Sequence, residues 1–376
     1  MKATVLVSRG YSRKTGYYHR ANRDRTTLTS LGLETAIRRA YLTGDKEGWR
    51  RLVRAVSTLR QIAADDIIVI ENYGALSVYV AMRLFIRRPN HRAVLVVHGS
   101  LAELREYRWA AVKRKAYSLI EKLSIRLLDR VFCVSQVMTA EFKRQYPAFS
   151  MKVLCSPNLP PADFYSAVRS AHAIGRRQIR EQLSMPRRAS ILLYAGNTQV
   201  WQNISLLIAT ARELASLDGF HTVVLTTESE AMTRLFRAAG IPSAAFTIRV
   251  AQQHEVPAYL VAADWLFVVR EENEINRVAC PTKAVEYLIS GTKLVTSAGL
   301  GDISRLVTEL DAGIVVKMRP PIAPKALARA ISAQASDGSG SSNQLPVPRT
   351  LPPPYERGNT ERLFADVIRK NEAACG

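Results

Sequence analysis

Residues 276–297 read NRVACPTKAVEYLISGTKLVTS, and this stretch places a short helix directly before a strand. Pro281 suits the first helical position, because a proline there loses no intrahelical hydrogen bond. Gly291 ends the helix, and the apolar run that follows it is typical of a buried strand. A helix that leads through a glycine into a buried strand is a repeating unit of parallel α/β sheets.

The same alternation of amphipathic helices and short apolar strands extends over both halves of the chain. In the first half, the predicted strands lie at residues 4–8, 66–70, 93–97, 130–134 and 152–155, and the helices at 49–62, 75–86, 108–128 and 136–145. In the second half, the strands lie at 190–196, 221–227, 245–250, 264–269, 293–297 and 313–316, and the helices at 204–217, 231–239, 256–262, 283–290, 302–309 and 324–333. The pattern predicts an α/β fold with two doubly wound, Rossmann-like domains that face each other across a cleft.

Composition divides the chain into two domains, a linker and a final helix. The first domain is predicted at residues 1–168 and the second at residues 186–334. Residues 335–354 are rich in Ser, Gly and Pro, so we expect a flexible linker there. Residues 355–373 carry one apolar stripe at helical spacing, and this helix should dock on the first domain.

The chain is strongly basic. Its 376 residues contain 53 Lys and Arg against 32 Asp and Glu, which gives a formal charge of +21. Residues 1–165 hold 29 basic and 13 acidic side chains, so 29 − 13 = +16 of this excess lies in the first half. Such a balance attracts a polyanion, whether nucleic acid, an anionic membrane surface or a phosphorylated substrate.

The cysteines and apolar runs bear on the compartment. The four cysteines show no metal-ligand spacing, so we expect reduced thiols, no disulfides and no metal site. No run approaches the roughly 18 to 20 apolar residues of a membrane span, and the N-terminus does not read as a signal peptide. These observations predict a cytoplasmic protein.

The helix that begins near Pro281 has a start suited to an anion. The amides of Thr282, Lys283 and Ala284 would lack intrahelical acceptors, and Lys283 and Glu286 would share the outward face. A phosphate at the amides and Lys283, with a ribose diol on the Glu286 carboxylate, would fit a nucleoside diphosphate. The alternative is an ordinary exposed Lys/Glu pair on a surface helix.

A family resemblance favours the nucleotide. Residues 266–302, LFVVREENEINRVACPTKAVEYLISGTKLVTSAGLGD, resemble the donor-binding signature of glycosyltransferase family 4, the group 1 enzymes with the GT-B fold. The positions that match the signature directly are Arg270, Asn276, Pro281, Thr282, Lys283, Glu286 and Gly291. Weaker likeness to the same family occurs, in the same order, at residues 129–142, 155–164, 191–207 and 255–265.

The resemblance implies a retaining glycosyltransferase that uses a nucleotide-sugar donor and needs no metal or other cofactor. Glu286 would bind the ribose hydroxyls, and Thr282, Lys283 and Arg270 would surround the diphosphate, with Lys283 and Arg270 as catalytic cations. The remaining donor contacts implied are Pro281, Asn276, Gly196 and Asn197. The absence of an Asp-x-Asp motif agrees with a metal-independent transfer.

His98, in the segment VLVVHGS, matches the position where the family carries a histidine that faces the donor sugar. The resemblance implies that it orients the sugar or polarises the acceptor region, and it is the third candidate catalytic residue. The alternative is a histidine that only caps the end of a strand. Glu103 is a weaker candidate nearby.

The sequence departs from the family in two places. The family pairs two glutamates, but Val278 stands eight positions before Glu286; Glu271, Glu272 or Glu274 could supply the missing sugar contact, and Glu274 is included among the candidate substrate-binding residues. The loop after Gly196 lacks the usual Arg and Lys, which makes Arg270 and Lys283 more important.

The basic segment SRGYSRKTGYYHRANRDR, residues 8–25, has two interpretations. It is either a solvated basic loop or an acceptor site for a lipid-linked, phosphorylated or acidic saccharide. Basic and apolar residues in RLFIRRPNHR and WAAVKRKAYSLIEKLSIR could then face an anionic membrane, which predicts peripheral attachment at the inner face of the cell membrane.

Three functions follow from these observations. The first is a glycosyltransferase that acts on a saccharide or lipid-linked acceptor in bacterial-type polysaccharide or glycolipid assembly. The second is a nucleic-acid or anionic-surface binding protein, which charge alone favours; no binding module is recognised, so no nucleic-acid partner is expected. The third is a GT-B-like nucleotide-sugar binder or isomerase without transferase activity.

Overall fold

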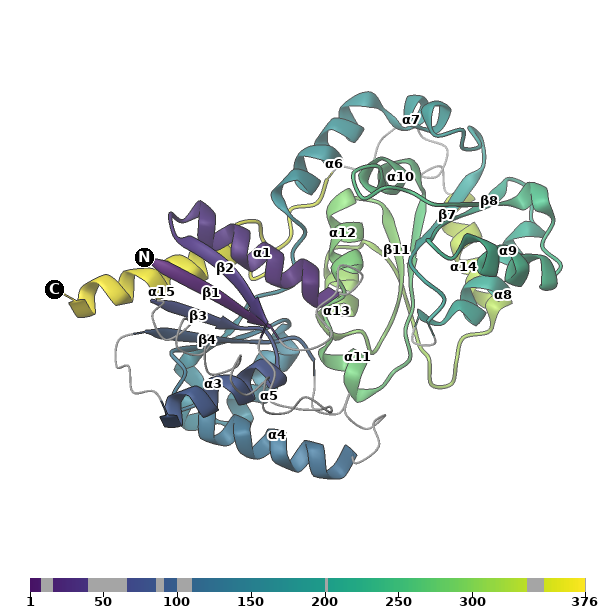
Figure 1. Ribbon diagram of the computed structural model, residues 1–376. Coiled ribbons are helices and arrows are strands. Elements are labelled where there is room, and N and C mark those ends of the chain that lie inside the picture. The colour runs from purple at the N-terminus through teal and green to yellow at the C-terminus, as the bar shows by residue number, and fades with distance from the viewer. Residues whose placement is uncertain are drawn as a thin grey trace. The chain divides into compact units, whose positions relative to one another are not determined.

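The computed structural model describes residues 1–7, 16–39, 66–85, 91–99, 110–199, 202–336 and 348–375 (Figure 1). The chain divides into two compact units: unit 1 comprises Met1–Asn158 and Pro352–Gly376, and unit 2 comprises Leu159–Leu351. Each unit is built on one six-stranded sheet in which every pairing is parallel. The predicted class, two doubly wound α/β units, is therefore confirmed.

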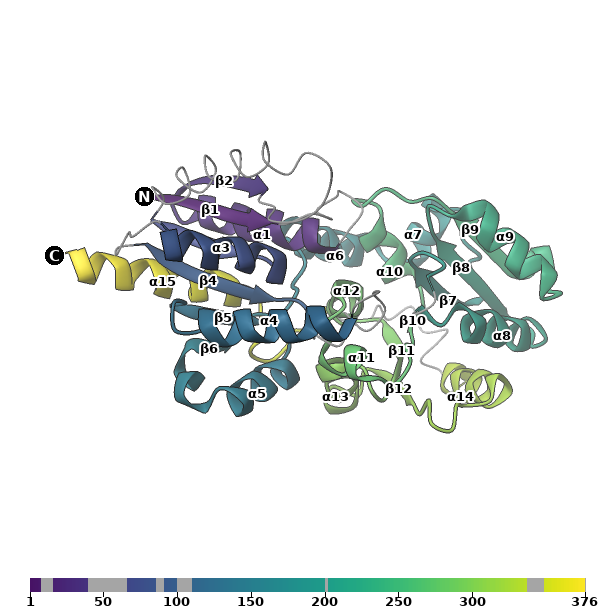
Figure 2. The same cartoon turned by 60° about the horizontal axis from the view of Figure 1, so that its bottom comes forward.

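The sheet of unit 1 has the strand order β2-β1-β3-β4-β5-β6 (Figure 2). Its strands are β1 (Lys2–Val7), β2 (Glu34–Arg39), β3 (Ile67–Ile70), β4 (Arg92–Val97), β5 (Arg130–Cys133) and β6 (Val153–Cys155). Its helices are α1 (Gly16–Ser30), α3 (Tyr73–Phe85), α4 (Ala110–Ser124), α5 (Gln136–Gln145) and α15 (Asn359–Cys375), with a 3-10 helix at Pro147–Lys152. The helix predicted at residues 49–62 and the candidate Glu103 lie outside the described residues.

The first and last helices of unit 1 cover the same face of its sheet. Leu28 of α1 and Phe364 of α15 are fully buried and belong to one apolar cluster with Val5, Val69 and Val94 of the strands. α1 and α15 also contact each other and run side by side (Figure 1). Helix α15 therefore completes the apolar core of unit 1, to which β1 and α1 also contribute.

Two elements of unit 1 differ from the sequence prediction. Residues 16–30 form helix α1, although the segment around them was interpreted as a basic loop or an acceptor site. Among the α1 side chains whose burial the structure describes, residues 20–30, the buried apolar ones are Ala21 and Leu28, so no broad apolar stripe marks this helix in the sequence. Residues 34–39 form the edge strand β2, whose half-buried sequence ETAIRR lacks the continuous apolar run of the central strands. The side chains of Arg9, Arg13 and Lys14 lie outside the described residues.

The sheet of unit 2 has the order β12-β11-β10-β7-β8-β9. Its strands are β7 (Ser190–Ala195), β8 (Phe220–Leu225), β9 (Phe246–Arg249), β10 (Trp265–Val268), β11 (Lys293–Ser297) and β12 (Gly313–Val316). Its helices are α6 (Ala162–Ile174), α7 (Arg176–Gln182), α8 (Ile204–Ala215), α9 (Ser229–Ala238), α10 (Val256–Ala262), α11 (Glu274–Val278), α12 (Thr282–Ser290), α13 (Gly301–Glu309) and α14 (Pro324–Ser336), with a 3-10 turn at Ser243–Ala245. The order reverses direction at β7 and β10, which is where doubly wound sheets bind ligands.

Polar contacts attach the segment before β7 to unit 2. Asp264, which precedes β10, accepts hydrogen bonds from Arg176 at 2.8 Å and Arg180 at 2.7 Å, and all three side chains are largely buried. His172 Nε2 lies 2.9 Å from the Ser290 carbonyl oxygen at the end of α12. Helices α6 and α7 therefore belong to unit 2, and the boundary after Asn158 lies ten residues before the predicted end of the first domain at 168.

No helix among the described residues has the length and apolar character needed to cross a membrane. Among the described residues, Cys133, Cys155 and Cys280 form no disulfide bond, and Cys133 and Cys280 are buried. Burial raises the pKa of the Cys133 thiol, so this residue behaves as a small apolar side chain.

Candidate anion and nucleotide site

Helix α12 begins without a side-chain cap. Pro281 has extended backbone (φ −65°, ψ 121°) and is the residue before the helix, one position earlier than predicted. The amide of Ala284 donates to the Pro281 carbonyl at 3.0 Å, so the expectation that it would be unpartnered was wrong. The amides of Thr282 and Lys283 have no hydrogen-bond acceptor in the part of the chain that the structure describes. Two N–H groups therefore point out of the helix start, where an anion is favoured.

Lys283 turns back from this helix toward the loop that follows β7. Its Nζ donates to Gln202 Oε1 at 2.6 Å and to the Ala195 carbonyl oxygen at 3.4 Å, and it lies 4.6 Å from the centre of the Tyr194 ring. Burial and, to a lesser degree, the neighbouring Arg270 guanidinium lower the pKa of Lys283 well below its ordinary value. All three close partners of the ammonium group are electrically neutral.

Arg270 follows β10 and approaches the same place from the opposite direction. Its backbone amide donates to Ser297 Oγ at 3.0 Å, and its Nη1 lies 3.5 Å from Asn276 Oδ1. Asn276 is buried and is fixed by donating to the Glu271 carbonyl oxygen at 2.9 Å. The Arg270 Nε–H is buried and finds no acceptor among the residues that the structure describes. The guanidinium thus has hydrogen-bonding capacity that the chain around it leaves unused.

Lys283 and Arg270 are neighbouring cations, and neither forms a salt bridge with a carboxylate of the described residues. The carboxylate that acts on Lys283 from a longer distance is that of Glu286, which favours the charged lysine, whereas Arg270 disfavours it. Burial lowers the pKa of Arg270 as it does that of Lys283. Partly buried cations that lack an acidic partner are electrostatically unfavourable unless a ligand supplies the negative charge.

Glu286 lies one turn further along α12 and is partly buried. Burial raises its pKa from the ordinary 4.5 to about 7, and the charge of Lys283 opposes this rise. The carboxyl group is therefore poised between its two forms near neutral pH, and Lys283 is the charged group that favours its ionised form. An ionised carboxylate here could accept hydrogen bonds from two adjacent hydroxyls.

The loop after β7 forms the other wall of this site. A Cβ at Gly196 would lie 2.5 Å from Tyr194 Oη and 3.2 Å from Lys283 Nζ, so only glycine leaves space there. Tyr194 Oη donates to the Asn197 carbonyl oxygen at 2.7 Å, which holds the loop against the strand. The Glu228 carboxylate accepts from the Thr198 amide at 2.8 Å and fixes the far side of the loop. Gly196 and Asn197 are thus brought to Lys283.

The three glutamates near α11 differ in their contacts and exposure. Glu272 Oε1 accepts a hydrogen bond from the Met318 amide at 2.8 Å, and the Glu272 side chain packs against Gly299. These contacts use Glu272 within the fold. Glu271 and Glu274 are exposed, and Glu274 is the first residue of α11. Val278 is buried in the core and offers no polar atom. Glu274 remains a prediction as a sugar contact.

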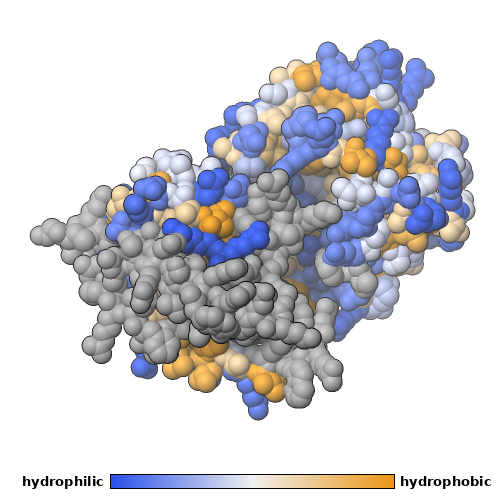
Figure 3. All heavy atoms as spheres, in the orientation of Figure 1, coloured by the Kyte–Doolittle hydropathy of each residue, from blue (hydrophilic) through white to orange (hydrophobic). Residues whose placement is uncertain are grey.

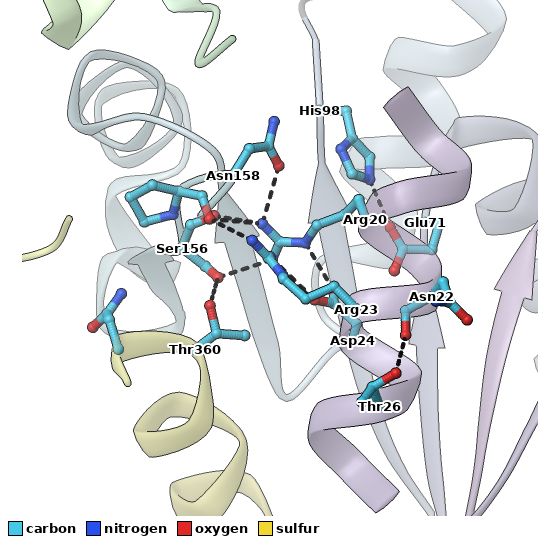
Figure 4. Close-up of polar contacts among 12 residues, drawn as sticks. Arg20, Asn22, Arg23, Asp24, Thr26, Glu71, His98, Ser156, Asn158 and Thr360 are labelled. Carbon is cyan, nitrogen blue, oxygen red and sulfur yellow. Dashed lines mark hydrogen bonds and ion pairs between the residues drawn. The ribbon is translucent and has the colours of Figure 1, made fainter. Parts of the chain in front are cut away.

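His98 lies in unit 1, after β4, and forms a separate buried cluster (Figure 4). Its Nε2 lies 2.6 Å from Oε2 of Glu71, which follows β3, and their side chains are 8% and 0% exposed. Burial, reinforced by the Asp24 carboxylate, raises the pKa of Glu71 well above its ordinary value. Burial and Arg20 lower the pKa of His98 to about 3. Both shifts favour the neutral forms of the two side chains.

Arg20 and Arg23 of the basic segment serve this cluster instead of an open acceptor surface. Arg20 is buried and donates to Asp24 at 2.9 Å, to the Ser156 carbonyl oxygen at 2.8 Å and to Ser156 Oγ at 2.8 Å (Figure 4). Arg23 donates to Asp24 at 3.1 Å and to the Pro157 carbonyl oxygen at 3.1 Å. Arg20 and Arg23 are therefore not solvated cations, because their donors are occupied within the fold. That the basic segment binds an acceptor stays a prediction.

Sequence reasoning missed Glu71, Asp24 and Gln202. The signal for Glu71 was a carboxylate placed directly after the buried strand IIVI, a position where a charge is costly unless it has a partner. Asp24 sits one turn after Arg20 in α1, a spacing typical of a helical ion pair, but that helix was not predicted. Gln202 carries no charge, and nothing local marks it as a partner of Lys283.

The sequence matches no protein-family model and no curated protein sequence. The structure is similar to that of Anabaena Alr3699/HepE in complex with UDP, with a TM-score of 0.64 and 14% identity over 100% of this chain and 98% of that chain. It is similar to a glycosyltransferase from Rickettsia africae ESF-5, with a TM-score of 0.68 and 14% identity over 98% of each chain. It is also similar to the UDP-GlcNAc 2-epimerase of Methanocaldococcus jannaschii, with a TM-score of 0.59 and 8% identity over 98% of this chain and 100% of that chain. At these identities the likeness establishes the fold that these proteins share.

Proposed function

We propose that the protein is a glycosyltransferase that takes its sugar from a nucleotide-sugar donor. The observation that carries the proposal is the pair of neighbouring cations Lys283 and Arg270 beside the start of α12, neither of which forms a salt bridge with a described carboxylate. A diphosphate would supply the missing negative charge and would accept hydrogen bonds from the Thr282 and Lys283 amides. Glu286 would accept hydrogen bonds from the ribose hydroxyls one turn deeper.

The likeness in fold to a protein whose structure holds UDP, and to a glycosyltransferase, supports the proposal, because it extends over nearly the whole length of each chain. The family 4 resemblance of residues 266–302 supports it independently, and it lies on the same residues that form the cation pair. Asn276, Pro281, Gly196 and Asn197 then have positioning roles around the donor. The base of the nucleotide is proposed as uracil because the neighbour binds UDP.

We propose transfer with retention at the anomeric carbon. In that reaction the bond between the sugar C1 and the diphosphate oxygen breaks, and an acceptor hydroxyl oxygen bonds to C1 from the same face. The hydroxyl proton passes to the departing phosphate oxygen, so charge and atoms balance. Lys283 and Arg270 would stabilise the negative charge that builds up on the diphosphate. Among the described residues, no group of three or more His, Cys, Asp or Glu side chains is placed to hold a metal ion.

His98 is proposed to contact the transferred sugar, as the family resemblance implies. Its neutral state is supported by the lowered pKa and by the hydrogen bond to Glu71. A neutral imidazole can orient a hydroxyl but supplies no positive charge. The role therefore concerns position rather than electrostatic stabilisation.

Ligand binding tests the proposal directly. Thermal stability of the purified protein is measured with UDP, GDP and ADP, with UDP-sugars, and with a duplex oligonucleotide. We expect stabilisation by a nucleoside diphosphate, and we expect Lys283→Ala and Glu286→Ala to weaken binding while both variants stay folded. Stabilisation by the oligonucleotide alone, or parental binding by both variants, would refute the site.

A second candidate, a nucleotide-sugar epimerase, is favoured by the likeness to the UDP-GlcNAc 2-epimerase. The two activities share a donor site, so binding does not separate them. Incubation of the protein with UDP-sugars does: release of UDP in the presence of acceptor saccharides indicates transfer, whereas a changed sugar that stays attached to UDP indicates epimerisation. We expect release of UDP.

We propose that the acceptor is a saccharide or lipid-linked saccharide in polysaccharide or glycolipid assembly, and that α4 attaches the protein to an anionic membrane from the cytoplasmic side. Val112, Leu119 and Leu123 lie on one face of α4 and are 61%, 57% and 57% exposed. Lys115 and Lys122 of the same helix are exposed beside them. In Figure 3, hydrophobic and hydrophilic atoms lie together along the lower edge, where Figure 1 places α4.

The opposite side of α4 is held firmly. Glu121 accepts hydrogen bonds from Tyr73 and Tyr146, each at 2.5 Å, so the helix cannot simply turn its apolar face inward. An interfacial helix with basic residues beside an apolar stripe binds anionic lipid. Sedimentation with vesicles tests this: we expect binding to phosphatidylglycerol vesicles, little binding to phosphatidylcholine vesicles, and loss of binding in Leu119→Ser/Leu123→Ser. Equal binding by this variant would exclude α4 as the attachment site.

A further inference from the structure

Gln202 has a contact that fixes which end of its side chain faces the candidate site. It lies just before α8, and its Oε1 is 2.6 Å from Lys283 Nζ. An ammonium group can only donate hydrogen bonds, so the atom that faces it must be the carbonyl oxygen of the carboxamide. The Nε2 amide group, with its two N–H donors, therefore points away from Lys283.

The donor end of Gln202 is unused within the described residues. Nε2 donates no hydrogen bond to any residue that the structure describes, whereas Oε1 accepts one from Lys283. The side chain is partly buried and its backbone is held in a turn, because the Gln202 amide donates to the Gln199 carbonyl oxygen at 2.9 Å. Gln202 is thus held by its backbone amide and by its side-chain oxygen, and the two N–H groups of its side chain are available to a ligand.

We propose that Gln202 binds the diphosphate of the donor through its Nε2 amide while its Oε1 keeps Lys283 in place. This inference rests on the proposed function, because it concerns the same site. It assigns a neutral donor to the loop after β7, in addition to the cations Lys283 and Arg270 and to the amides at the start of α12. The ligand class is the diphosphate part of a nucleoside diphosphate.

Electrostatics explains why a neutral residue suits this position. Lys283 is already largely buried beside Arg270, and the positive charge of Arg270 disfavours the charged form of the lysine. A third cation at residue 202 would lie in hydrogen-bond range of Lys283 and would raise this cost further before any ligand binds. A carboxamide accepts from the lysine and donates to the phosphate, so it joins the two without adding charge.

The test compares a nucleoside diphosphate with its nucleoside. Calorimetry gives the affinities of the full-length protein for whichever of UDP, GDP or ADP binds tightest, and for the matching nucleoside, which lacks the phosphates. The variants are Gln202→Ala, Gln202→Glu and the control Gln199→Ala, an exposed glutamine in the same loop. Thermal unfolding without ligand confirms that each variant is folded.

We expect Gln202→Ala to weaken the diphosphate about tenfold or more, since it removes a hydrogen bond to a charged group. Its affinity for the nucleoside should not change. Gln202→Glu should weaken the diphosphate further, because a carboxylate would pair with Lys283 and repel the ligand. Gln199→Ala should bind both ligands like the parent.

Two results would overturn the inference. If Gln202→Ala binds the diphosphate as well as the parent or better, Gln202 only occupies Lys283 in the absence of ligand. If the nucleoside is weakened as much as the diphosphate, the substitution acts on the loop and not on a phosphate contact. Failure of the parent protein to bind any nucleoside diphosphate would instead refute the proposed function, so the two failures are distinguishable.

Discussion

The raised pKa of Glu286 should make the stability of unit 2 depend on pH, and a single substitution of Glu286 should remove this dependence. The folded carboxyl has a pKa of about 7, against an ordinary value of 4.5. Between these values the folded protein holds a proton that the unfolded chain has released. The free energy of unfolding should therefore fall as pH rises through this window, and the loss is complete above the folded pKa.

The size of this effect follows from the difference between the two pKa values. Each pKa unit corresponds to about 1.4 kcal/mol, so ionising Glu286, whose pKa is raised from 4.5 to about 7, costs the fold at most about 3.5 kcal/mol. Because the carboxyl is partly exposed, solvent screening reduces this to about 2 kcal/mol. Glu286→Gln keeps the shape and polarity of the side chain but cannot ionise. Its free energy of unfolding relative to the parent should rise by about 2 kcal/mol between pH 4.5 and pH 8.

The measurement must report on unit 2 alone, because the two units need not unfold together. Parent and Glu286→Gln are equilibrated in a urea series at each pH, and a short hydrogen-exchange pulse at fixed pH labels the unfolded fraction. Mass spectrometry of peptides from β7 and β10 then gives the unfolding curve of the unit 2 sheet. A difference between variant and parent that is the same at pH 4.5 and pH 8 would refute the argument, because Glu286 would then have an ordinary pKa.

Three further predictions follow from other parts of the structure. Lys283→Ala should weaken nucleoside diphosphate binding at least tenfold and leave nucleoside binding unchanged in calorimetry; an equal loss for both ligands would contradict a phosphate contact. Glu71→Gln should change the stability of unit 1 by less than about 1 kcal/mol in urea unfolding, because the raised pKa of Glu71 favours its neutral form, whereas a loss of about 3 to 5 kcal/mol would show that Glu71 is ionised and paired with His98. Phe364→Ala should cost unit 1 about 3 to 5 kcal/mol, since Phe364 is fully buried against Phe132 with ring centres 5.3 Å apart, and the urea midpoint of unit 2 should not move.

The central strands of both sheets were predictable because each is a short, nearly continuous apolar run, as in IIVI of β3 and WLFV of β10. The start of α12 was predictable for a local reason: proline, then polar residues, then an amphipathic helix that ends at Gly291. Helix α1 was not, because its stability comes from Arg20 and from packing against the rest of unit 1, which the sequence of residues 16–30 does not reveal.

The contacts that the sequence did not predict join residues that lie far apart in the chain. Glu71 meets His98 across 27 positions, and Gln202 meets Lys283 across 81. No periodicity or spacing rule connects residues so far apart, since only the strand order of each sheet brings them together. Sequence reasoning found one member of each pair from its chemistry and could not find the other.

The return of the chain to unit 1 has a consequence for biosynthesis. Ribosomes deliver residues 1–158 first, then the 200 residues from 159 to 358, and only then helix α15, which covers the apolar face around Phe132. At 5 to 20 residues per second, that interval lasts about 10 to 40 s. During this interval, the sheet of unit 1 has an exposed apolar surface, while unit 2 can already fold. Chaperone protection would matter most in this interval. Unit 1 is synthesised first, but it can complete its core only after unit 2 has been synthesised.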